Sequence, residues 1–472
     1  MMKQSFMKGR RFGEENAMNT STKTGDFSSG KVWKQVVNLA LPLTMAEIVQ
    51  LLYNIVDRIY LGHMPGGDSL PLTGVGLVLP VISLIGAFTS LFGQGGTPLF
   101  SMARGAKNEE RASLLEGCVF VSLLSCSLIL MALLYALHVP LLYAFGASER
   151  SFSYARDYLL IYLIGTPFIM LSTGLNGFIN AQGFPRVGMM TTIFGAALNL
   201  LLDPLFLFVL NLGVRGAALA TVLSQALSCA WVLLFLTGKK ALLPLRFRYM
   251  RLQLQMLREI VSLGVVGFIM KATNFLVQMT ANTTLQQYGG DVYVSVMTVA
   301  NSVREILTLP ATGVTSGSQP VTGYNYGAKQ YGRVRESIRF TSLTAIGYTL
   351  IAWLLVLAAA RPLAGLFTSD QETLRLAPRI LWLYFMGFVF QAFQLSAQTT
   401  FQALGDTRHA IFFSLLRKVV IVFPLTLLLP RMGLGTDGVF LAEPISNLLG
   451  GMAAFVTMYL TVYRKLQADP RP

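Results

Sequence analysis

Long apolar segments separated by short polar connections run through almost the whole of this chain. Twelve are long enough for a helix to cross a bilayer core, which takes about 20 apolar residues. Only 12% of the 472 residues are charged, about half the share found in soluble domains. These features predict an all-α integral membrane protein. The segments lie near residues 33–62, 71–101, 112–137, 154–181, 187–210, 215–237, 258–286, 292–325, 337–360, 372–403, 409–429 and 437–463.

The basic residues indicate how the chain sits in the membrane. Residues 1–32 are polar and lack the apolar core of a signal peptide, so we expect a flexible cytoplasmic tail. With this end inside, most of the 37 lysines and arginines fall in the inner connections, as the positive-inside rule requires. An even number of spans then places the C-terminal tail, 464–472, inside as well. We predict a multi-pass plasma-membrane protein whose net charge of +15 needs no nucleic-acid partner.

The two halves of the sequence resemble each other at an offset of 222 residues. The match runs without a gap from about residue 95 to 224 and keeps loop glycines, prolines and cations in step. Six spans in each copy give a repeat about an axis along the membrane normal, which is typical of transporters. We therefore predict two pseudo-symmetric six-helix lobes, 33–237 and 258–463, with a cytoplasmic linker at 238–257. Matched pairs include Gly95 with Gly317, Gly105 with Gly327, Arg111 with Arg333, Gly165 with Gly387, and Gly216 with Gly438.

Several chemistries have no support in the sequence. Cys118, Cys126 and Cys229 lie inside apolar segments without a CxxC pair, and the three histidines stand at span ends without an HExxH motif. A membrane-embedded acyltransferase or glycosyltransferase would need a reactive His/Asp or metal constellation. No Walker motif is present, so the chain does not hydrolyse ATP itself. We predict no enzyme activity and no cofactor, and an H⁺ or Na⁺ gradient as the energy source.

Acidic residues in the first half form the strongest candidate site. An ionisable side chain within a span is a functional candidate by default. Asp57 in the first span and Asp203 in the fifth lie at similar depth, Asn199 shares a helical face with Asp203, and Thr221 starts the sixth span at comparable height. Two close carboxylates in a low dielectric do not easily both ionise. The set predicts a proton acceptor or a Na⁺ site; alternatively, each acid hydrogen-bonds a neighbouring helix.

The second half lacks such an acidic pair and carries polar stripes instead. Side chains at spacings of three and four follow the seventh and tenth spans, facing either a partner helix or a wet cleft; we favour the cleft. We expect Arg417 and Lys418 to snorkel or pair, and Glu443 to stabilise the start of its helix. The stripes consist of Lys271, Asn274, Gln278 and Asn282, and of Gln391, Gln394, Gln398 and Gln402.

Four segments carry a resemblance to a known family. They are residues 56–62 (VDRIYLG), 176–183 (NGFINAQG), 199–204 (NLLLDP) and 213–221 (GVRGAALAT). In their order and spacing they resemble the multidrug and toxic compound extrusion (MATE) transporters, most closely the MepA-like bacterial branch. The resemblance covers roughly residues 33–465.

The resemblance implies a V-shaped pair of lobes that exports organic, often cationic, compounds by antiport with H⁺ or Na⁺ and so confers drug resistance. It implies that the protein works as a monomer. It also implies an ion-coupling network formed by Asp57, Tyr158, Asn199, Asp203 and Thr221. If the coupling ion is Na⁺, its ligands are Asp57, Asn199, Asp203 and Thr221. The NorM-like branch carries acids on its seventh and tenth helices, which this chain lacks, so we expect no cation site in the second lobe. With the polar stripes, the predicted substrate cavity comprises Gln50, Tyr53, Asn176, Asn180, Lys271, Asn274, Gln278, Gln391, Gln394 and Gln398.

A second transport function stays open. A flippase or exporter of a lipid-linked saccharide or another amphiphile would need a cationic central cavity. Lys271, Arg304, Arg417 and Lys418 are compatible with that function, whereas the paired acids of the first half favour drug efflux.

Overall fold

A computed structural model describes residues 25–62, 74–145, 147–368 and 371–468. These residues form helices and no β-strand, which confirms the predicted all-α membrane fold. Within them, eight helices are long and apolar enough to cross a membrane, or ten when each of two bent pairs counts as one span. Two glycine breaks inside continuous helical stretches give twelve helical segments in the described residues, because the limb 291–327 adds to the ten and Thr407–Tyr463 divides into two. One lies at Gly290 (φ 71°) and the other at Gly433 and Gly435 (φ 95° and 52°), conformations that glycine adopts without steric cost.

The first lobe contains six spans, and side-chain caps mark the starts of two of its helices, α5 and α6. Asn108 accepts a hydrogen bond from the Arg111 N–H, and Ser148 and Ser151 form a capping box. The fourth span is bent by 55° between its two helices, at Gly165. The helices are α2 (Val32–Gly62), α4 (Leu79–Gly105), α5 (Glu109–Ala144), α6 (Glu149–Ile164), α7 (Thr166–Ala181), α8 (Pro185–Pro204) with the π-helical turn Leu205–Val209, and α9 (Val214–Thr237).

The second lobe repeats this plan. Its tenth span bends by 44° beside Gly387, the repeat equivalent of Gly165. The helix α10 (Leu254–Gly327) contains the seventh and eighth spans as two limbs, 254–289 and 291–327, that meet at Gly290. The others are α11 (Tyr331–Gly365), α12 (Gln371–Phe385), α13 (Phe388–Ala403), α14 (Thr407–Leu415), α15 (Phe423–Leu429), α16 (Gly435–Ser446), α17 (Met452–Met458) and α18 (Lys465–Ala468), with π-helical turns Leu416–Val422, Pro430–Leu434, Asn447–Gly451 and Tyr459–Tyr463.

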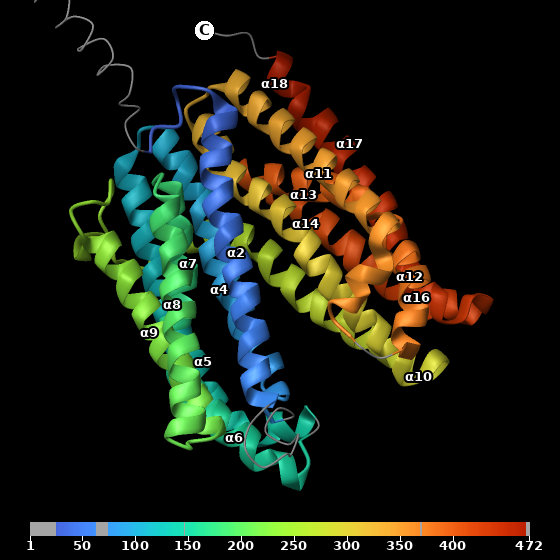
Figure 1. Ribbon diagram of the computed structural model, residues 1–472. Coiled ribbons are helices and arrows are strands. Elements are labelled where there is room, and N and C mark those ends of the chain that lie inside the picture. The colour runs from blue at the N-terminus through green and yellow to red at the C-terminus, as the bar shows by residue number, and fades with distance from the viewer. Residues whose placement is uncertain (1–24, 63–73, 146, 369–370, 469–472) are drawn as a thin grey trace, which may run out of the picture.

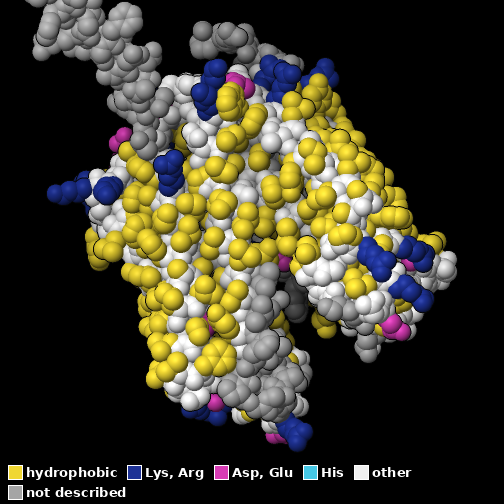
Figure 2. Space-filling view, viewed as in Figure 1, with side chains coloured by type: hydrophobic (Ala, Val, Ile, Leu, Met, Phe, Trp, Pro, Cys, Tyr) yellow, Lys and Arg dark blue, Asp and Glu magenta, His cyan; other side chains and the backbone are white. Residues whose placement is uncertain are grey.

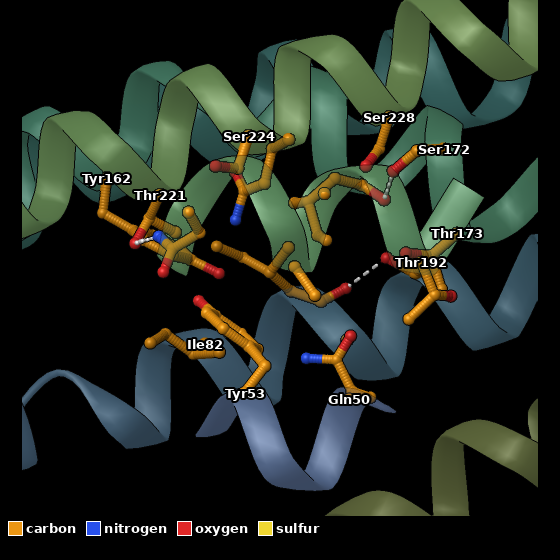
Figure 3. A pocket seen from close by; sticks show the side chains of 18 of the residues that line it. Gln50, Tyr53, Ile82, Tyr162, Ser172, Thr173, Thr192, Thr221, Ser224 and Ser228 are labelled. Atoms are coloured by element: carbon orange, nitrogen blue, oxygen red, sulfur yellow. Dashed lines mark hydrogen bonds between the residues drawn. The ribbon is translucent and has the colours of Figure 1, made fainter. Parts of the chain in front are cut away.

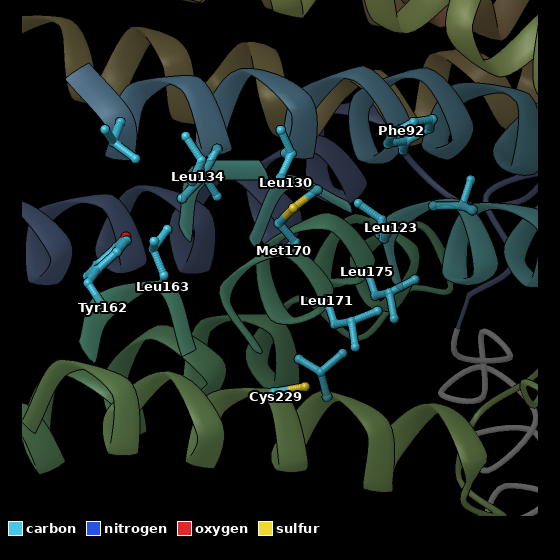
Figure 4. Close-up of a cluster of buried hydrophobic side chains, with 14 of the residues drawn as sticks. Phe92, Leu123, Leu130, Leu134, Tyr162, Leu163, Met170, Leu171, Leu175 and Cys229 are labelled. Carbon is cyan, nitrogen blue, oxygen red and sulfur yellow. The ribbon is translucent and has the colours of Figure 1, made fainter. Parts of the chain in front are cut away.

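Side chains distribute as the bilayer requires. Each lobe has an apolar core, and in the first lobe leucines of α5 and α7 pack around Met170 (Figure 4). Large apolar side chains also cover the outside; Leu201 and Leu234 are 70% and 71% exposed. The space-filling view shows a broad apolar flank with lysines and arginines gathered towards the two ends (Figure 2). The exposed apolar flank is the surface that faces lipid.

The two lobes touch at the end where the described chain begins and ends, and they diverge at the other (Figure 1). A hollow opens between them at the divergent end (Figure 2). At the closed end α4 crosses the second limb of α10, where a methyl group on Gly105 would lie 1.8 Å from the Tyr324 carbonyl oxygen. A methyl group on Gly327 would lie 1.9 Å from that of Met102. Both pairs obey the offset of 222, so the repeat forms this crossing symmetrically.

Residues 25–31 pack across the closed end, although the sequence analysis assigns them to a flexible tail. Phe27 is buried and its ring meets that of Tyr324 edge-on at 5.6 Å. Arg104 of α4 donates to one backbone carbonyl of this segment (2.9 Å), and Arg333 of α11 donates to three others (2.7, 2.9 and 3.3 Å). The segment, called the N-terminal clasp below, therefore bridges the two lobes.

Candidate functional site

A cavity of about 670 Å³ lies in the first lobe, between α2, α4, α6, α7, α8 and α9, and reaches Lys271 of α10. Gln50 and Tyr53 of α2 face Thr221 and Ser224 of α9 across it (Figure 3). Its volume falls in the range typical of small-molecule sites, 300 to about 1,000 Å³. The polar side chains that line it are Gln50, Tyr53, Thr89, Tyr158, Tyr162, Ser172, Thr173, Thr191, Thr192, Asn199, Thr221, Ser224, Gln225, Ser228 and Lys271.

Most of the hydroxyl groups in this lining are absent from the sequence-based prediction. On α9 they form a stripe with Gln225, in which Thr221, Ser224 and Ser228 share one face of an otherwise apolar helix. Their spacing of three and four is the signal that identifies the two polar stripes of the second half. Applied to the sixth span, the same criterion finds them.

Three of the predicted ion-coupling residues meet at the wall of the cavity. Asp203 and Asn199 are each 1% exposed and stand one turn apart on α8. With its amide oriented to satisfy both neighbours, Asn199 donates to Asp203 Oδ2 (2.6 Å) and accepts from the Thr221 N–H (3.3 Å). The Thr221 hydroxyl lies 3.4 Å from the same amide. Pro204 follows directly and the helix continues as a π-turn, a feature frequent at functional sites.

Of the other two predicted ion-coupling residues, the structure describes the side chain of Tyr158 but not that of Asp57. Tyr158 is buried in the cavity wall and its ring stacks on Tyr162 at 5.9 Å. The side chain of Asp57 lies outside the described residues, so its meeting with Asp203 stays a prediction. Gln50 and Tyr53 of the same helix line the cavity.

Asn176 and Asn180 of α7 face α8 in the structure. Neither is among the residues that line the cavity. Both face Gly188 of α8, where a methyl group would lie 2.2 Å from Asn180 Oδ1 and 3.1 Å from Asn176 Oδ1, and Thr191 donates to Asn176 Oδ1 at 3.3 Å. These amides lie at the interface between α7 and α8, and their part in a substrate cavity stays a prediction.

The other predicted cavity residues divide between separate spaces. Lys271 lines the first-lobe cavity and donates to the Gly86 carbonyl (3.1 Å), linking α10 to α4. The second lobe holds two smaller cavities of about 110 and 40 Å³. Asn274 lines both, Gln278 lines the larger, and Gln391, Gln394 and Gln398 line the smaller.

Glu443 does not stabilise the start of its helix, contrary to the prediction from the sequence. It lies in the third turn of α16, away from the helix start, and is 6% exposed. Its carboxylate pairs with Arg304 (3.0 Å), Lys418 (3.1 Å) and Arg417 (3.4 Å). Arg417 and Lys418 are therefore paired with an acid.

The model of the MatE family matches residues 42–205 and 268–428, more than half of the chain. The multidrug export protein MepA of Staphylococcus haemolyticus (strain JCSC1435) is 24% identical over 434 residues, which cover 92% of this chain and 94% of that protein.

Solved structures share the fold. The outward-facing conformation of a multidrug resistance MATE family transporter of the MOP superfamily superposes with a TM-score of 0.87 at 23% identity, covering 96% of this chain and all of that one. A MATE crystal structure in the bent conformation gives 0.88 at 23%, covering 95% and 100%.

The family match confirms the resemblance seen in the sequence, and the structural matches confirm the two-lobed fold of twelve membrane-spanning helices. MATE proteins are transporters, which agrees with the prediction that the chain is not an enzyme. The chain belongs to the MatE family.

Proposed function

We propose that this protein is a multidrug exporter that exchanges organic, amphiphilic and often cationic compounds for H⁺ or Na⁺. One observation carries the proposal: a cavity of about 670 Å³ shares Tyr158, Asn199 and Thr221 with the predicted ion-coupling network. Cargo and ion that occupy one chamber affect each other's affinity, which is the basis of antiport.

The coupling ion has suitable donors in this chamber. A carboxylate oxygen of Asp203, the amide oxygen of Asn199 and the hydroxyl of Thr221 are hard ligands, the type that hard cations such as Na⁺ prefer. Protonation of Asp203 would serve equally, since either ion removes a negative charge that attracts a cationic cargo. Asp57 on α2 completes the proposed set of ion ligands.

Transport then follows from alternating access of the lobes. With the lobes closed at the divergent end, cargo enters from the cytoplasm and binds among the tyrosine, hydroxyl and amide groups of the cavity. After the lobes change to the arrangement described here, ion binding weakens the hold on the cargo, which leaves through the hollow. The ion-loaded protein returns, and the ion dissociates inside.

Placement in the cell is part of the proposal. The protein works in the plasma membrane with both termini in the cytoplasm, as its basic inner connections favour. The hollow then opens to the outside. Each lobe contributes to the cleft within one chain, so a monomer suffices, and small molecules and lipid are its partners.

The flippase alternative needs cations concentrated around a large central cavity. In the described part of the chain, Lys271 lines the cavity of about 670 Å³, whereas Arg304, Arg417 and Lys418 surround Glu443 in the other lobe, beside cavities of about 110 and 40 Å³. This distribution favours drug efflux.

The test is ethidium efflux from proteoliposomes with imposed proton and sodium gradients that are collapsed separately. Loss of efflux on collapse of one gradient names the coupling ion. Efflux that survives collapse of both gradients contradicts antiport, and translocation of a fluorescent polyprenyl-linked saccharide without any dye efflux supports the flippase. Protein-free liposomes provide the background.

A further inference from the structure

Four ionisable side chains meet inside the second lobe, apart from the chamber described above. Arg304 comes from the second limb of α10, Arg417 and Lys418 from the π-turn after α14, and Glu443 from α16. All but Arg304 are at least nine-tenths buried. The Glu443 carboxylate contacts all three cations at 3.0 to 3.4 Å. These four residues are called the cationic cluster below.

The charges of this cluster do not balance. Arginine stays protonated in proteins, so the two guanidinium groups exceed the single carboxylate by one charge, and a protonated Lys418 raises the excess to two. Among the described residues that line the adjoining cavities, Glu443 is the only acid. Glu305, which follows Arg304 on α10 and interacts with its charge, is exposed and lines neither cavity. An unmatched charge in a protein interior is costly, because its attraction to water is lost and nothing replaces it.

The surroundings offer room for the missing anion. The cavities of about 110 and 40 Å³ both include Asn274 and Lys418 in their linings, so they adjoin at the cluster. Three exposed amides of the first limb of α10, Asn274, Gln278 and Asn282, line the larger one, so this cavity is accessible from the polar stripe. Since one water takes about 30 Å³ of liquid volume, the larger cavity accommodates a group of a few heavy atoms.

We propose that the cationic cluster is an oxyanion-binding site, which takes a carboxylate or phosphate group. Guanidinium groups match the geometry of both oxyanions, and amide N–H groups of the stripe supply further donors. Bound between Arg304 and Lys418, the oxyanion neutralises the excess charge beside Glu443. Free anions and anionic lipid headgroups share this chemistry. The second lobe thus binds charge opposite to that attracted by the acids of the first.

Equilibrium dialysis of the purified protein against ³²P-labelled inorganic phosphate tests the site directly. We expect saturable binding that acetate competes away. Arg304→Gln, at the most exposed member of the cluster, lowers the affinity about tenfold or more, because one cation is lost at short range. Glu443→Gln raises the affinity, because the competing carboxylate is gone. Arg379→Gln, which removes a cation paired with Asp437 elsewhere in the same lobe, leaves binding unchanged.

The wild-type isotherm decides the proposal even if a variant fails to fold, and the elution volume and Tm of each variant report folding. Absence of saturable binding of phosphate and acetate to the wild type in detergent and in phosphatidylcholine nanodiscs overturns the site. Phosphate binding unaffected by a folded Arg304→Gln variant overturns it as well. Nanodiscs with added phosphatidylglycerol distinguish the source: loss of phosphate binding there identifies a lipid headgroup as the occupant, and unchanged binding identifies a free anion.

Discussion

The side-chain amide of Asn199 contacts both Asp203 and Thr221, so it joins α8 to α9 at the cavity wall. This arrangement explains how a change at the acid reaches the lining of the cavity. We expect Asp203→Asn to abolish dye efflux while the protein still reaches the membrane, because an amide neither takes up a proton nor carries charge. Resistance and uptake assays in cells measure the loss.

The matched control is Asp437→Asn. Asp437 is an acid on α16, as Asp203 is on α8, but it pairs with Arg379 outside the cavity. This variant should keep its efflux. Unchanged efflux in both Asp203→Asn and Asp57→Asn would refute the ion-coupling assignment.

Thr221 supplies a hydroxyl to the same site. Thr221→Val keeps the shape but removes an oxygen, which we expect to cost about 1 kcal/mol of ion binding, or about a fivefold higher ion concentration for half-maximal efflux. Thr237→Val is the control on the same helix, because that hydroxyl donates to the Leu233 carbonyl of its own helix. An identical ion dependence for the two variants would remove Thr221 from the site.

At the scale of elements, the closed end depends on two glycines. Gly105→Ala or Gly327→Ala places a methyl group less than 2 Å from a carbonyl oxygen of the crossing helix, so the helices must separate. Overpacking of this kind costs about 1–3 kcal/mol, and we expect a lower Tm and reduced efflux. Gly347→Ala of α11, where a methyl group meets nothing within 4 Å, should leave Tm unchanged or raise it slightly. Equal effects of all three would contradict a tight crossing.

The N-terminal clasp gives a second prediction at this scale. Arg333→Ala removes its donors to three carbonyls of residues 25–31, so amide hydrogen exchange there should speed up about tenfold, as expected for about 1.4 kcal/mol. Arg339→Ala, exposed further along α11, is the control. Protection that stays unchanged in Arg333→Ala would show that the clasp does not depend on this arginine.

The clasp should not respond to pH near neutrality. Burial raises the pKa of Asp26, but hydrogen bonds from Ser28 and Tyr324 and the charge of Arg333 outweigh it, so that this pKa lies below its ordinary value of 3.8. A lowered pKa stabilises the folded state above the unfolded value and loses that contribution only as the pH falls through the folded one. Asp26 therefore stays charged wherever the transporter works.

Hydropathy and spacing predicted the elements well but not their bends. The twelve spans follow from apolar length, and the offset of 222 pairs Gly165 with Gly387, yet nothing local shows that both spans bend there. At each bend another helix approaches closely: a methyl group at Gly165 would lie 2.4 Å from Gln225 Oε1, and one at Gly387 would lie 2.5 Å from the Pro444 oxygen.

The sequence predicts how deep in the membrane the candidate-site residues lie, but not which neighbouring helix each side chain faces. Helix arithmetic put Asn199, Asp203 and Thr221 at one height, where the structure joins them. The family resemblance, not the spacing, assigns Asn176 to the cavity, and in the structure its amide lies beside Gly188 and Thr191 of α8. Spacing gives the face of a helix without saying which neighbour that face meets. Glu443 was assigned to a helix start for a similar reason, since its partners come from other helices far apart in sequence.

For the whole molecule, the chamber bordered by Asp203 lies in the first lobe and the cationic cluster lies in the second. The hollow between the lobes opens away from the end where the described chain begins and ends (Figures 1 and 2). The central claim is that cargo and ion oppose each other at one first-lobe chamber. Thermodynamic linkage then demands that each weaken the affinity for the other by the same factor.

The most direct test is the dissociation constant of ethidium for the purified protein, measured across a pH series and, separately, a sodium series at constant ionic strength. The account predicts that affinity falls as one of the two ions rises, by about 5- to 150-fold at saturation, and that Asp203→Asn flattens this dependence. An ethidium affinity that is the same at every proton and sodium concentration would contradict it.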